Sequence, residues 1–436
     1  MLRKLSSRFK ILQPLSIRDF ALLWTGLTVS GTGDGITLVA LAWQVYELSN
    51  APTAMSVVGV SWSLPMVVFL LLGGVVSDRF DRRSVMIASD VVRGAAVAAI
   101  GALSIADALE LWHVWVLIGV YGVGEAFFGP AFGAIVPDIV PKAQLVAANS
   151  LEQLVRPATF QLLGPALGGL AIAALGGDVG YVFLADAATF AFSAACLTAM
   201  RARSVRALDP ADRSSALREI AEGLRFVRSQ TWCWATLAMA ALVLLCYIGP
   251  FDVLLPYVVK NELGGGADDL GLVFAVGGVG AIMASLLMAQ RGLPRRHMRF
   301  MYVAFGLEAG ALALYAFATE AWHAMAVAMF ASACATSGMV VWGTLMHALV
   351  PAHLQGRVRS LDWLVSIGLV PLSFAITGPM AETIGVDTTL IGAGVLGAAG
   401  CLLFMLVPGL YDTEADGRLA ALDAADEPAA PETATL

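Results

Sequence analysis

The chain has 436 residues, of which 58% are hydrophobic and 14% are charged, and its mean hydropathy is +0.79. A soluble domain carries about 25% charged residues, so this composition excludes a soluble globular protein and indicates a chain built largely of bilayer spans. The net charge of -7 comes largely from the C-terminal tail, and no basic face predicts a nucleic-acid partner.

Apolar runs along the chain predict twelve transmembrane helices, because a helix needs about 20 apolar residues to cross a bilayer. The predicted class is therefore an all-α integral membrane protein. In chain order the predicted spans are 20–46, 52–77, 84–106, 112–137, 146–175, 179–200, 231–259, 268–291, 300–319, 322–349, 361–385 and 387–408.

The basic residues predict the orientation of these spans. With the N-terminus inside, 23 of the 26 lysines and arginines fall in cytoplasmic segments, whereas Lys260 alone falls in an outer loop. Cytoplasmic loops are enriched in lysine and arginine, so both termini are predicted to be cytoplasmic. The predicted location is the inner (cytoplasmic) membrane of a cell, with multiple passes.

Paired motifs recur in the two sets of spans at a nearly constant offset of 210 to 214 residues, which indicates a six-plus-six duplication. The pairs are Arg82-Arg83 with Arg295-Arg296, Val140-Pro141 with Val350-Pro351, and Gly164-Pro165 with Gly378-Pro379. The predicted parts are an N-terminal six-helix half (1–200), a cytoplasmic linker with an amphipathic helix (201–230), a C-terminal six-helix half (231–410) and a disordered acidic tail (411–436).

The loop between the second and third predicted spans is short and basic. It contains Gly74, Asp78, Arg79, Arg82 and Arg83. This pattern resembles the signature of the major facilitator superfamily of membrane transporters. Asp81 stands where the family has its second glycine. The alternative is an ordinary positive-inside loop.

The resemblance implies that this loop belongs to a conformational gate. Asp90 and Arg93 lie three residues apart on the third span, near its cytoplasmic end. We expect them to form a gate or packing network with Asp78 and Arg83.

The fifth predicted span contains a proline flanked by glycines. Proline kinks a helix and glycine allows helices to approach closely. The residues Gly164, Pro165, Gly168 and Gly169 resemble the end of a motif found in drug/proton antiporters of the superfamily, whose earlier glycine is Phe160 here. The alternative is a packing hinge that has no bearing on the direction of transport.

Further segments narrow the resemblance to the enterobactin-exporter and macrolide-efflux branch, which contains drug:proton antiporters. It covers nearly the whole chain outside residues 1–15 and the tail, and it implies two halves that rock around a central substrate site. The segments that carry it are Phe127–Ala131, Val136–Pro141, Ala147–Leu151, Leu254–Tyr257 with Leu263-Gly264, and Gly356–Val358.

Charged residues inside spans are costly and are functional candidates by default. Asp34 lies in the first predicted span and Glu125 in the fourth, and the resemblance implies that both spans line the central cavity. A carboxylate there can take up a proton or pair with a cationic drug. The alternative is a structural ion pair, with Arg156 of the fifth span as the candidate partner. The family's fourth-helix arginine is missing, and Tyr121 lies near its place.

Other polar and aromatic residues in the spans carry weaker indications. Asp186 and Asp252 lie near the outer ends of their spans and are predicted to form an outside latch. Glu308, in the ninth span, has no predicted role. Five aromatic residues are candidates for a drug cavity, or for ordinary packing or the interfacial aromatic belt: Trp24, Trp62, Trp342, Tyr247 and Phe251.

The sequence therefore predicts a secondary transporter that exports small amphipathic molecules, as in multidrug efflux, by proton antiport and alternating access. Its partners are a small-molecule substrate, protons as coupling ion and the lipid bilayer. The alternatives are a siderophore or secondary-metabolite exporter, another facilitator-type solute transporter and, more remotely, a non-transporting membrane protein. No nucleotide-binding loop or metal motif is present in the sequence, so no enzyme activity, metal or cofactor is predicted.

Overall fold

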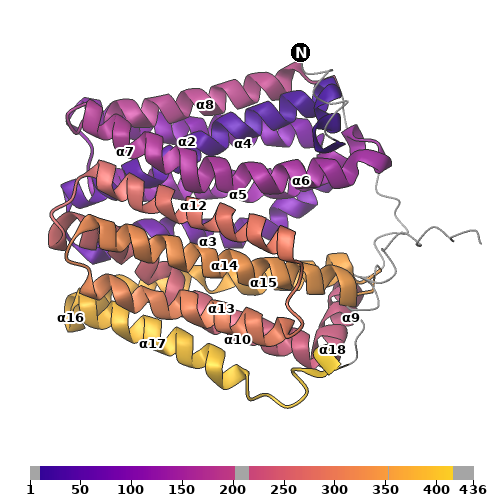
Figure 1. The fold of residues 1–436 in the computed structure, drawn as a ribbon. Coiled ribbons are helices and arrows are strands. Elements are labelled where there is room, and N and C mark those ends of the chain that lie inside the picture. The colour runs from indigo at the N-terminus through magenta and orange to yellow at the C-terminus, as the bar shows by residue number, and fades with distance from the viewer. Residues whose placement is uncertain (1–9, 202–215, 352, 416–436) are drawn as a thin grey trace, which may run out of the picture.

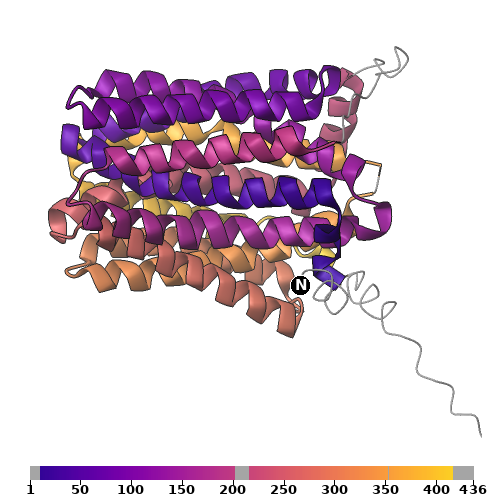
Figure 2. The same ribbon diagram turned by 90° about the horizontal axis from the view of Figure 1, so that it is seen from above.

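The computed structural model of the chain describes residues 10–201, 216–351 and 353–415. Side chains are described throughout these ranges except at residues 10, 78, 153, 154, 156, 216–220 and 415. Every regular element in this part of the chain is a helix, and the long helices run side by side along one direction (Figure 1, Figure 2).

A first group of helices, here the first bundle, comes from the N-terminal part of the chain (Figure 1). Within it α3 packs on α5, α4 packs on α5 and α8, and α2 packs on α7 and α8. A π-helix, η3, joins α6 to α7. The members are α2 (Arg18–Leu48), α3 (Pro52–Arg79), α4 (Arg82–Ile105), α5 (Leu111–Ile139), α6 (Leu145–Arg156), η3 (Pro157–Leu163), α7 (Gly164–Ala174) and α8 (Gly180–Ala199).

A second group, the second bundle, follows in the chain (Figure 1). Here α12 packs on α14, α13 packs on α14 and α17, and α10 packs on α16 and α17. The members are α10 (Thr231–Gly249) with its continuation η5 (Pro250–Leu254), α11 (Leu255–Tyr257) and η6 (Val258–Glu262), then α12 (Ala267–Arg291), α13 (His297–Ala311) with η7 (Leu312–Phe317), α14 (Ala321–Leu349), α15 (Gln355–Gly368), α16 (Val370–Ile384) and α17 (Val386–Phe404).

Eleven helical segments of the described chain are long and apolar enough to cross a membrane. Their bounds lie within a few residues of the predicted spans, apart from the span expected at 361–385, where the helical segment already begins at Gln355. The remaining predicted span is occupied by α2, which has 31 residues but is not among the eleven. The cause is local: residues 30–35 read Ser-Gly-Thr-Gly-Asp-Gly, and this polar, glycine-rich run lowers the hydropathy of α2.

The two bundles touch through α3 against α16 and through α7 with η3 against α12. Hydrogen bonds between described residues of the two bundles gather at one end, where α2 ends and α3 begins. They join Tyr46 Oη to the Val253 carbonyl (2.6 Å), Asn50 to Asn261 (2.7 Å), the Thr53 N–H to Glu382 (3.1 Å) and the Gly378 N–H to Ser56 Oγ (2.8 Å). We call these contacts, together with those of Lys260 described next, the outer clamp, because the orientation predicted from the sequence places this end outside.

Lys260, the one basic residue of the predicted outer loops, belongs to the outer clamp. Its ammonium donates to the Tyr46 carbonyl (2.7 Å) and to Glu47 Oε1 (2.7 Å), and it lies 5.2 Å from the centre of the Trp43 ring. Carbonyls near the end of α2 are favourable partners for a cation. Lys260 thus ties the end of η6 to the end of α2.

The predicted linker and tail lie partly outside the described residues. Of the linker, α9 (Ala216–Ser229) is a helix that packs on α15, and its Glu222 pairs with Arg357. The tail was expected to be disordered from residue 411, but the described chain continues into the short helix α18 (Asp412–Ala415). Its Glu414 accepts hydrogen bonds from the first N–H groups of α13, so ordered structure extends past the expected boundary.

Candidate functional site

Arg93 of α4 forms the centre of a polar network inside the first bundle. Its side chain is only 4% exposed, and Nη2 donates to Asp90 Oδ1 at 2.6 Å. The guanidinium carbon lies 4.5 Å from the centre of the Phe128 ring and 4.6 Å from that of Phe190. Aromatic faces attract a desolvated cation, so these rings help to hold Arg93 away from water.

Asp34, one of the two carboxylates singled out from the sequence, joins this network through Tyr121. The Tyr121 hydroxyl donates to Asp34 Oδ1 at 2.6 Å and links α5 to α2. Both residues interact electrostatically with Arg93. The side chain of Arg156, the predicted partner, lies outside the described part of the chain. Arg93 therefore supplies the cation that the described residues place near Asp34.

Glu125, the second predicted carboxylate, accepts a hydrogen bond from Trp62 Nε1 at 2.6 Å. This contact joins α5 to α3, and it is possible because Gly122 lets α5 approach the Trp62 carbonyl closely. The Trp62 ring also packs edge-on against Phe374 of α16, with 6.5 Å between the ring centres. Glu125 is thus one side chain away from the contact between the bundles.

Asp186 of α8 is a member of the network that sequence reasoning misplaced. It is fully buried, and its two carboxylate oxygens accept hydrogen bonds from Thr37 (2.6 Å) and Thr189 (3.0 Å). The outside latch with Asp252 was therefore a wrong prediction for Asp186, which faces α2. Gly33 of α2 makes room for it, since a Cβ at that position would lie 2.0 Å from Asp186 Oδ1.

We call the group formed by Asp34, Asp90, Glu125 and Asp186 around Arg93 the Arg93 network. In the described residues it sets four carboxylates against one guanidinium, and each carboxylate also interacts with a group on another helix. A set of carboxylates that exceeds its cations inside a membrane protein favours uptake of protons or of a cationic ligand.

The predicted gate segment makes different contacts from those expected. Arg82 is buried, donates to the Ala134 carbonyl of α5 (2.9 Å) and forms an ion pair with Asp138. Arg83 donates to carbonyls at the end of α8, those of Thr198 (2.6 Å) and Met200 (2.7 Å). Both arginines therefore tie helix ends together within the first bundle.

This arrangement corrects the predicted network of Asp90 and Arg93 with Arg83. Among described residues, Arg83 bonds to α8 while the Asp90–Arg93 pair faces the interior of the bundle. The side chain of Asp78 lies outside the described residues. Arg79 is exposed, and Gly74 has open space where a Cβ would stand.

Asp81, which replaces the family's second glycine, caps the N-terminus of α4. Its carboxylate accepts hydrogen bonds from the Ser84 N–H (3.3 Å) and the Ser84 hydroxyl (2.8 Å). An aspartate at this position satisfies one of the free N–H groups of the helix and is favoured by the helix dipole.

We expect Asp81→Ala to lower the stability of the protein by about 1 kcal/mol, because the first turn of α4 loses its cap. Asp81→Asn retains the hydrogen-bond acceptor and is the matched control. Thermal unfolding of the purified protein in detergent measures the difference. Equal melting temperatures for Asp81→Ala and the native protein would show that the cap contributes nothing.

The predicted kink is a π-helical turn followed by close helix contacts. Pro165 cannot donate to the carbonyl four residues before it, and the turn that precedes it, η3, is widened to π geometry. A Cβ on Gly164 would lie 2.6 Å from Gly35 of α2, and one on Gly168 would lie 2.9 Å from the Ile36 carbonyl. The kink therefore lets α7 pack directly on α2.

Gly169 makes the corresponding contact with the second bundle. A Cβ there would lie 2.5 Å from the Ala267 carbonyl and 3.0 Å from the Cα of Gly271, both in α12. A Cβ on Gly271 would in turn lie 2.4 Å from the Pro165 carbonyl. Backbone meets backbone where the bundles touch, and only glycine fits.

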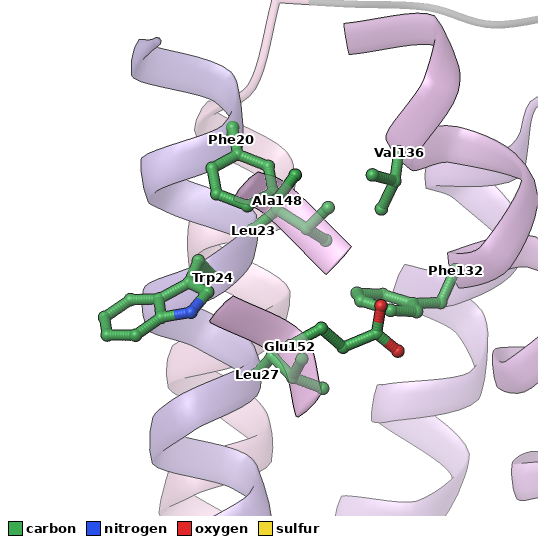
Figure 3. Close-up of a pocket in the computed structure, with 8 residues that line it drawn as sticks. All are labelled: Phe20, Leu23, Trp24, Leu27, Phe132, Val136, Ala148 and Glu152. Carbon is green, nitrogen blue, oxygen red and sulfur yellow. The ribbon is translucent and has the colours of Figure 1, made fainter. Parts of the chain in front are cut away.

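A small pocket lies between α2, α5 and α6, near the end of the bundle opposite to the outer clamp (Figure 3). Its walls are mainly apolar. Glu152 extends from α6 so that its carboxylate lies beside the Phe132 ring (Figure 3). Glu152 was not among the candidate residues predicted from the sequence, although it is a charged residue within a predicted span. The lining residues are Phe20, Leu23, Trp24, Leu27, Phe132, Val136, Ala148 and Glu152.

Comparison with known sequences gives a family match over nearly the whole chain. The model of the family described as transmembrane secretion effector matches residues 10–430. Multidrug efflux pump Tap of Mycolicibacterium fortuitum is 29% identical over 391 residues, covering 85% of this chain and 90% of its own length. The MFS-type transporter YfiS of Bacillus subtilis is 28% identical (87% and 89%), and macrolide efflux protein A of Streptococcus pyogenes is 22% identical (86% and 93%).

Solved structures of transporters share the fold. A bacterial homologue of the iron transporter ferroportin in its inward-facing state superposes with a TM-score of 0.66 at 15% identity, covering 89% of this chain and 99% of its own. A POT family transporter in complex with a thioalcohol-conjugated peptide superposes with a TM-score of 0.69 at 11% identity, covering 92% and 96%.

Proposed function

Because this chain belongs to the transmembrane secretion effector family, a family of major facilitator type, we propose that it exports small amphipathic molecules, drugs among them, in exchange for protons. The names of Tap and macrolide efflux protein A support export of drugs. The observation that carries the proton part of the proposal is the Arg93 network, where carboxylates exceed the described cations beside the contact between the bundles.

The proposal includes a topology. We take α2 as the twelfth span, because it packs along α7 and α8 as a full-length member of the first bundle. The two bundles are then six-helix halves, with both chain termini on the cytoplasmic side of the cell membrane. This orientation places the outer clamp on the outer face. We infer that the protein is closed at this end and open toward the cytoplasm, which is the state that loads an exported substrate.

Alternating access follows from moving the bundles against each other. The outer clamp breaks while the inner ends approach, and the segment with Gly74, Asp78, Arg79, Arg82 and Arg83 lies at those inner ends. Arg82 and Arg83 keep the inner end of α4 joined to α5 and α8, so the first bundle moves as one body. In that role they are positioning residues of the gate.

Asp34 and Glu125 are the proposed coupling residues. Each accepts a hydrogen bond of 2.6 Å from an aromatic residue, Tyr121 or Trp62, on a neighbouring helix. Gain or loss of a proton changes the charge that these contacts and Arg93 must balance, and so changes how α2, α3 and α5 pack. Exchange of a proton for a cationic substrate leaves that balance unchanged.

We expect Asp34→Asn and Glu125→Gln to weaken the dependence of export on an imposed proton gradient. The measurement is efflux of a dye such as ethidium from proteoliposomes, first with the gradient and then with it collapsed by an ionophore. Glu320→Gln, an exposed carboxylate at the start of α14, is the control and should behave as the native protein.

Two results would contradict the proposal. If the native protein still exports the dye after the gradient has been collapsed, proton antiport is contradicted. Native gradient dependence in both variants would remove Asp34 and Glu125 as coupling residues. Absence of transport for any dye or drug would point to a narrower substrate, and a screen of secreted metabolites would then test the exporter proposal itself.

A further inference from the structure

The second bundle contains two carboxylates that the proposed coupling does not use. Asp252 lies in the π-helix η5. Glu308 lies on the face of α13 that carries the buried residues Ala304 and Ala311, and Tyr315 follows in η7. Tyr247 of α10 is within electrostatic range of both. Neither carboxylate forms a hydrogen bond or an ion pair with another described residue.

Aromatic rings surround this position. Phe251 stacks on Tyr247 with 5.3 Å between ring centres, packs edge-on against Phe274 at 5.8 Å and contacts Tyr315 at 6.4 Å. We call these four residues the Phe251 cluster. The faces of such rings attract cations, and they attract organic cations most strongly when water is excluded.

Tyr315 adds an unused polar group. Its side chain is 1% exposed, and its hydroxyl has no hydrogen-bond partner among the described residues. A buried hydroxyl without a partner costs free energy, so such groups in native proteins usually have a role. Asp252, Glu308, Tyr247 and Phe251 are only partly buried.

No cation of the protein balances these carboxylates within the described part of the second bundle. Its lysine and arginine residues lie near the helix ends: Lys260 at the outer end, and Arg291, Arg295, Arg296, Arg299, Arg357 and Arg359 at the inner end. The first bundle differs, because Arg93 lies among its carboxylates. An ionised carboxylate at membrane depth needs a positive partner. Each of these carboxylates is therefore either protonated or paired with a cation that comes from outside the protein.

We propose that Asp252, Glu308 and the Phe251 cluster bind the positively charged nitrogen or phosphonium of a lipophilic substrate. This inference rests on the proposed export function and names its substrate class and recognition site. The carboxylates provide charge, and the rings provide an apolar surface that favours a delocalised cation.

The test uses the full-length protein in lipid nanodiscs and tetraphenylphosphonium, whose charge does not depend on pH. Triphenylphosphine oxide is the neutral probe of similar shape. The variants are Asp252→Asn, Glu308→Gln, the double variant and Phe251→Leu. The control is Asp387→Asn, an exposed carboxylate at the outer end of the same bundle. Equilibrium binding of both probes is measured for each protein.

We expect each carboxylate variant to bind tetraphenylphosphonium about tenfold or more weakly, as for a close, desolvated charge pair. We expect Phe251→Leu to weaken it about two- to tenfold. The neutral probe and the control variant should stay at native affinity. Native affinity of the double variant for the cation, an equal loss for the neutral probe, or no binding of the cation by the native protein would each overturn the inference.

A parallel transport assay separates this inference from the proposed function. If the native protein binds tetraphenylphosphonium through Asp252 and Glu308 but does not export it from proteoliposomes, the binding site is supported and the proposed export of such cations is contradicted. If the native protein exports the cation and the double variant still binds it with native affinity, the proposed export is supported and the proposed binding site is contradicted.

Discussion

Replacing Gly169 with leucine is expected to abolish export by holding the two bundles apart at their outer ends. The backbone of α12 leaves no room for a side chain at this position, because even a Cβ would lie 2.5 Å from the Ala267 carbonyl. The neighbouring group is backbone, which cannot rotate away as a side chain can. The closed outer end would therefore become unfavourable relative to a conformation in which α7 and α12 are separated.

Accessibility of a reporter cysteine measures this shift. Ser56 is buried beneath the Gly378 N–H in the outer clamp, so Ser56→Cys, in a protein whose five cysteines have been replaced, reports on opening. We expect a membrane-impermeant thiol reagent added outside to label it slowly in the parent and rapidly with Gly169→Leu. Gly169→Ala should give an intermediate rate.

Gly133→Leu is the matched control, since Gly133 of α5 has open space where a Cβ would stand. It should leave both labelling and export at parental levels. Slow labelling together with full export by Gly169→Leu would show that the contact of α7 with α12 does not control access. A monodisperse elution profile confirms that each variant is folded.

Replacing Arg93 with alanine is expected to lower the free energy of unfolding by about 3–5 kcal/mol, the cost of removing one member of a buried ion pair. The substitution leaves Asp90, which is only 1% exposed, without its guanidinium partner. It also leaves an empty volume between Phe128 and Phe190. This is the largest stability effect that we expect for a single substitution in the first bundle.

Unfolding of the purified protein by heat and by denaturing detergent measures the change. The double variant Asp90→Asn with Arg93→Met removes both charges and should recover much of the loss, because no uncompensated ion remains buried. Arg79→Ala, at an exposed position, should change stability by no more than about 0.5 kcal/mol. A double variant no more stable than Arg93→Ala would mean that ring packing, rather than charge pairing, explains the effect.

Hydropathy predicted the positions of the helices well, because spans are long and their apolar character accumulates over many residues. The first span was predicted in spite of its glycine-rich, polar run, which takes α2 out of the group of segments apolar enough to cross a membrane. The kink at Pro165 was predicted from the missing N–H of proline. The π-helical geometry of the turn before it could not be predicted, because the sequence shows only that one backbone hydrogen bond is lost and not how the helix adapts.

The sequence singled out Asp34 and Glu125 because a charge in an apolar run stands out on its own. It could not identify their partners Tyr121 and Trp62. A hydropathy pattern does not show how each helix is rotated about its own axis, and this rotation decides which side chains face each other. Asp186 shows the same limit: it was assigned to an outer latch from its depth, whereas its orientation toward Thr37 decides its role. Arg83 was expected to join Asp90 and Arg93 in a gate or packing network, and it points instead to α8.

The outer clamp has a consequence for the energy source of the protein. Three of its links are neutral hydrogen bonds, each worth about 0.5–1.5 kcal/mol net, and the others involve the charged groups of Glu382 or Lys260. Its one ion pair lies at the surface, where such pairs are worth about 1 kcal/mol or less. The closed and open forms then differ by only a few kcal/mol. A differential affinity of about 5.5 kcal/mol moves a population from 1:99 to 99:1. Binding of one substrate molecule or one proton is therefore enough to invert the equilibrium, and the cycle can run on ligand gradients without nucleotide hydrolysis.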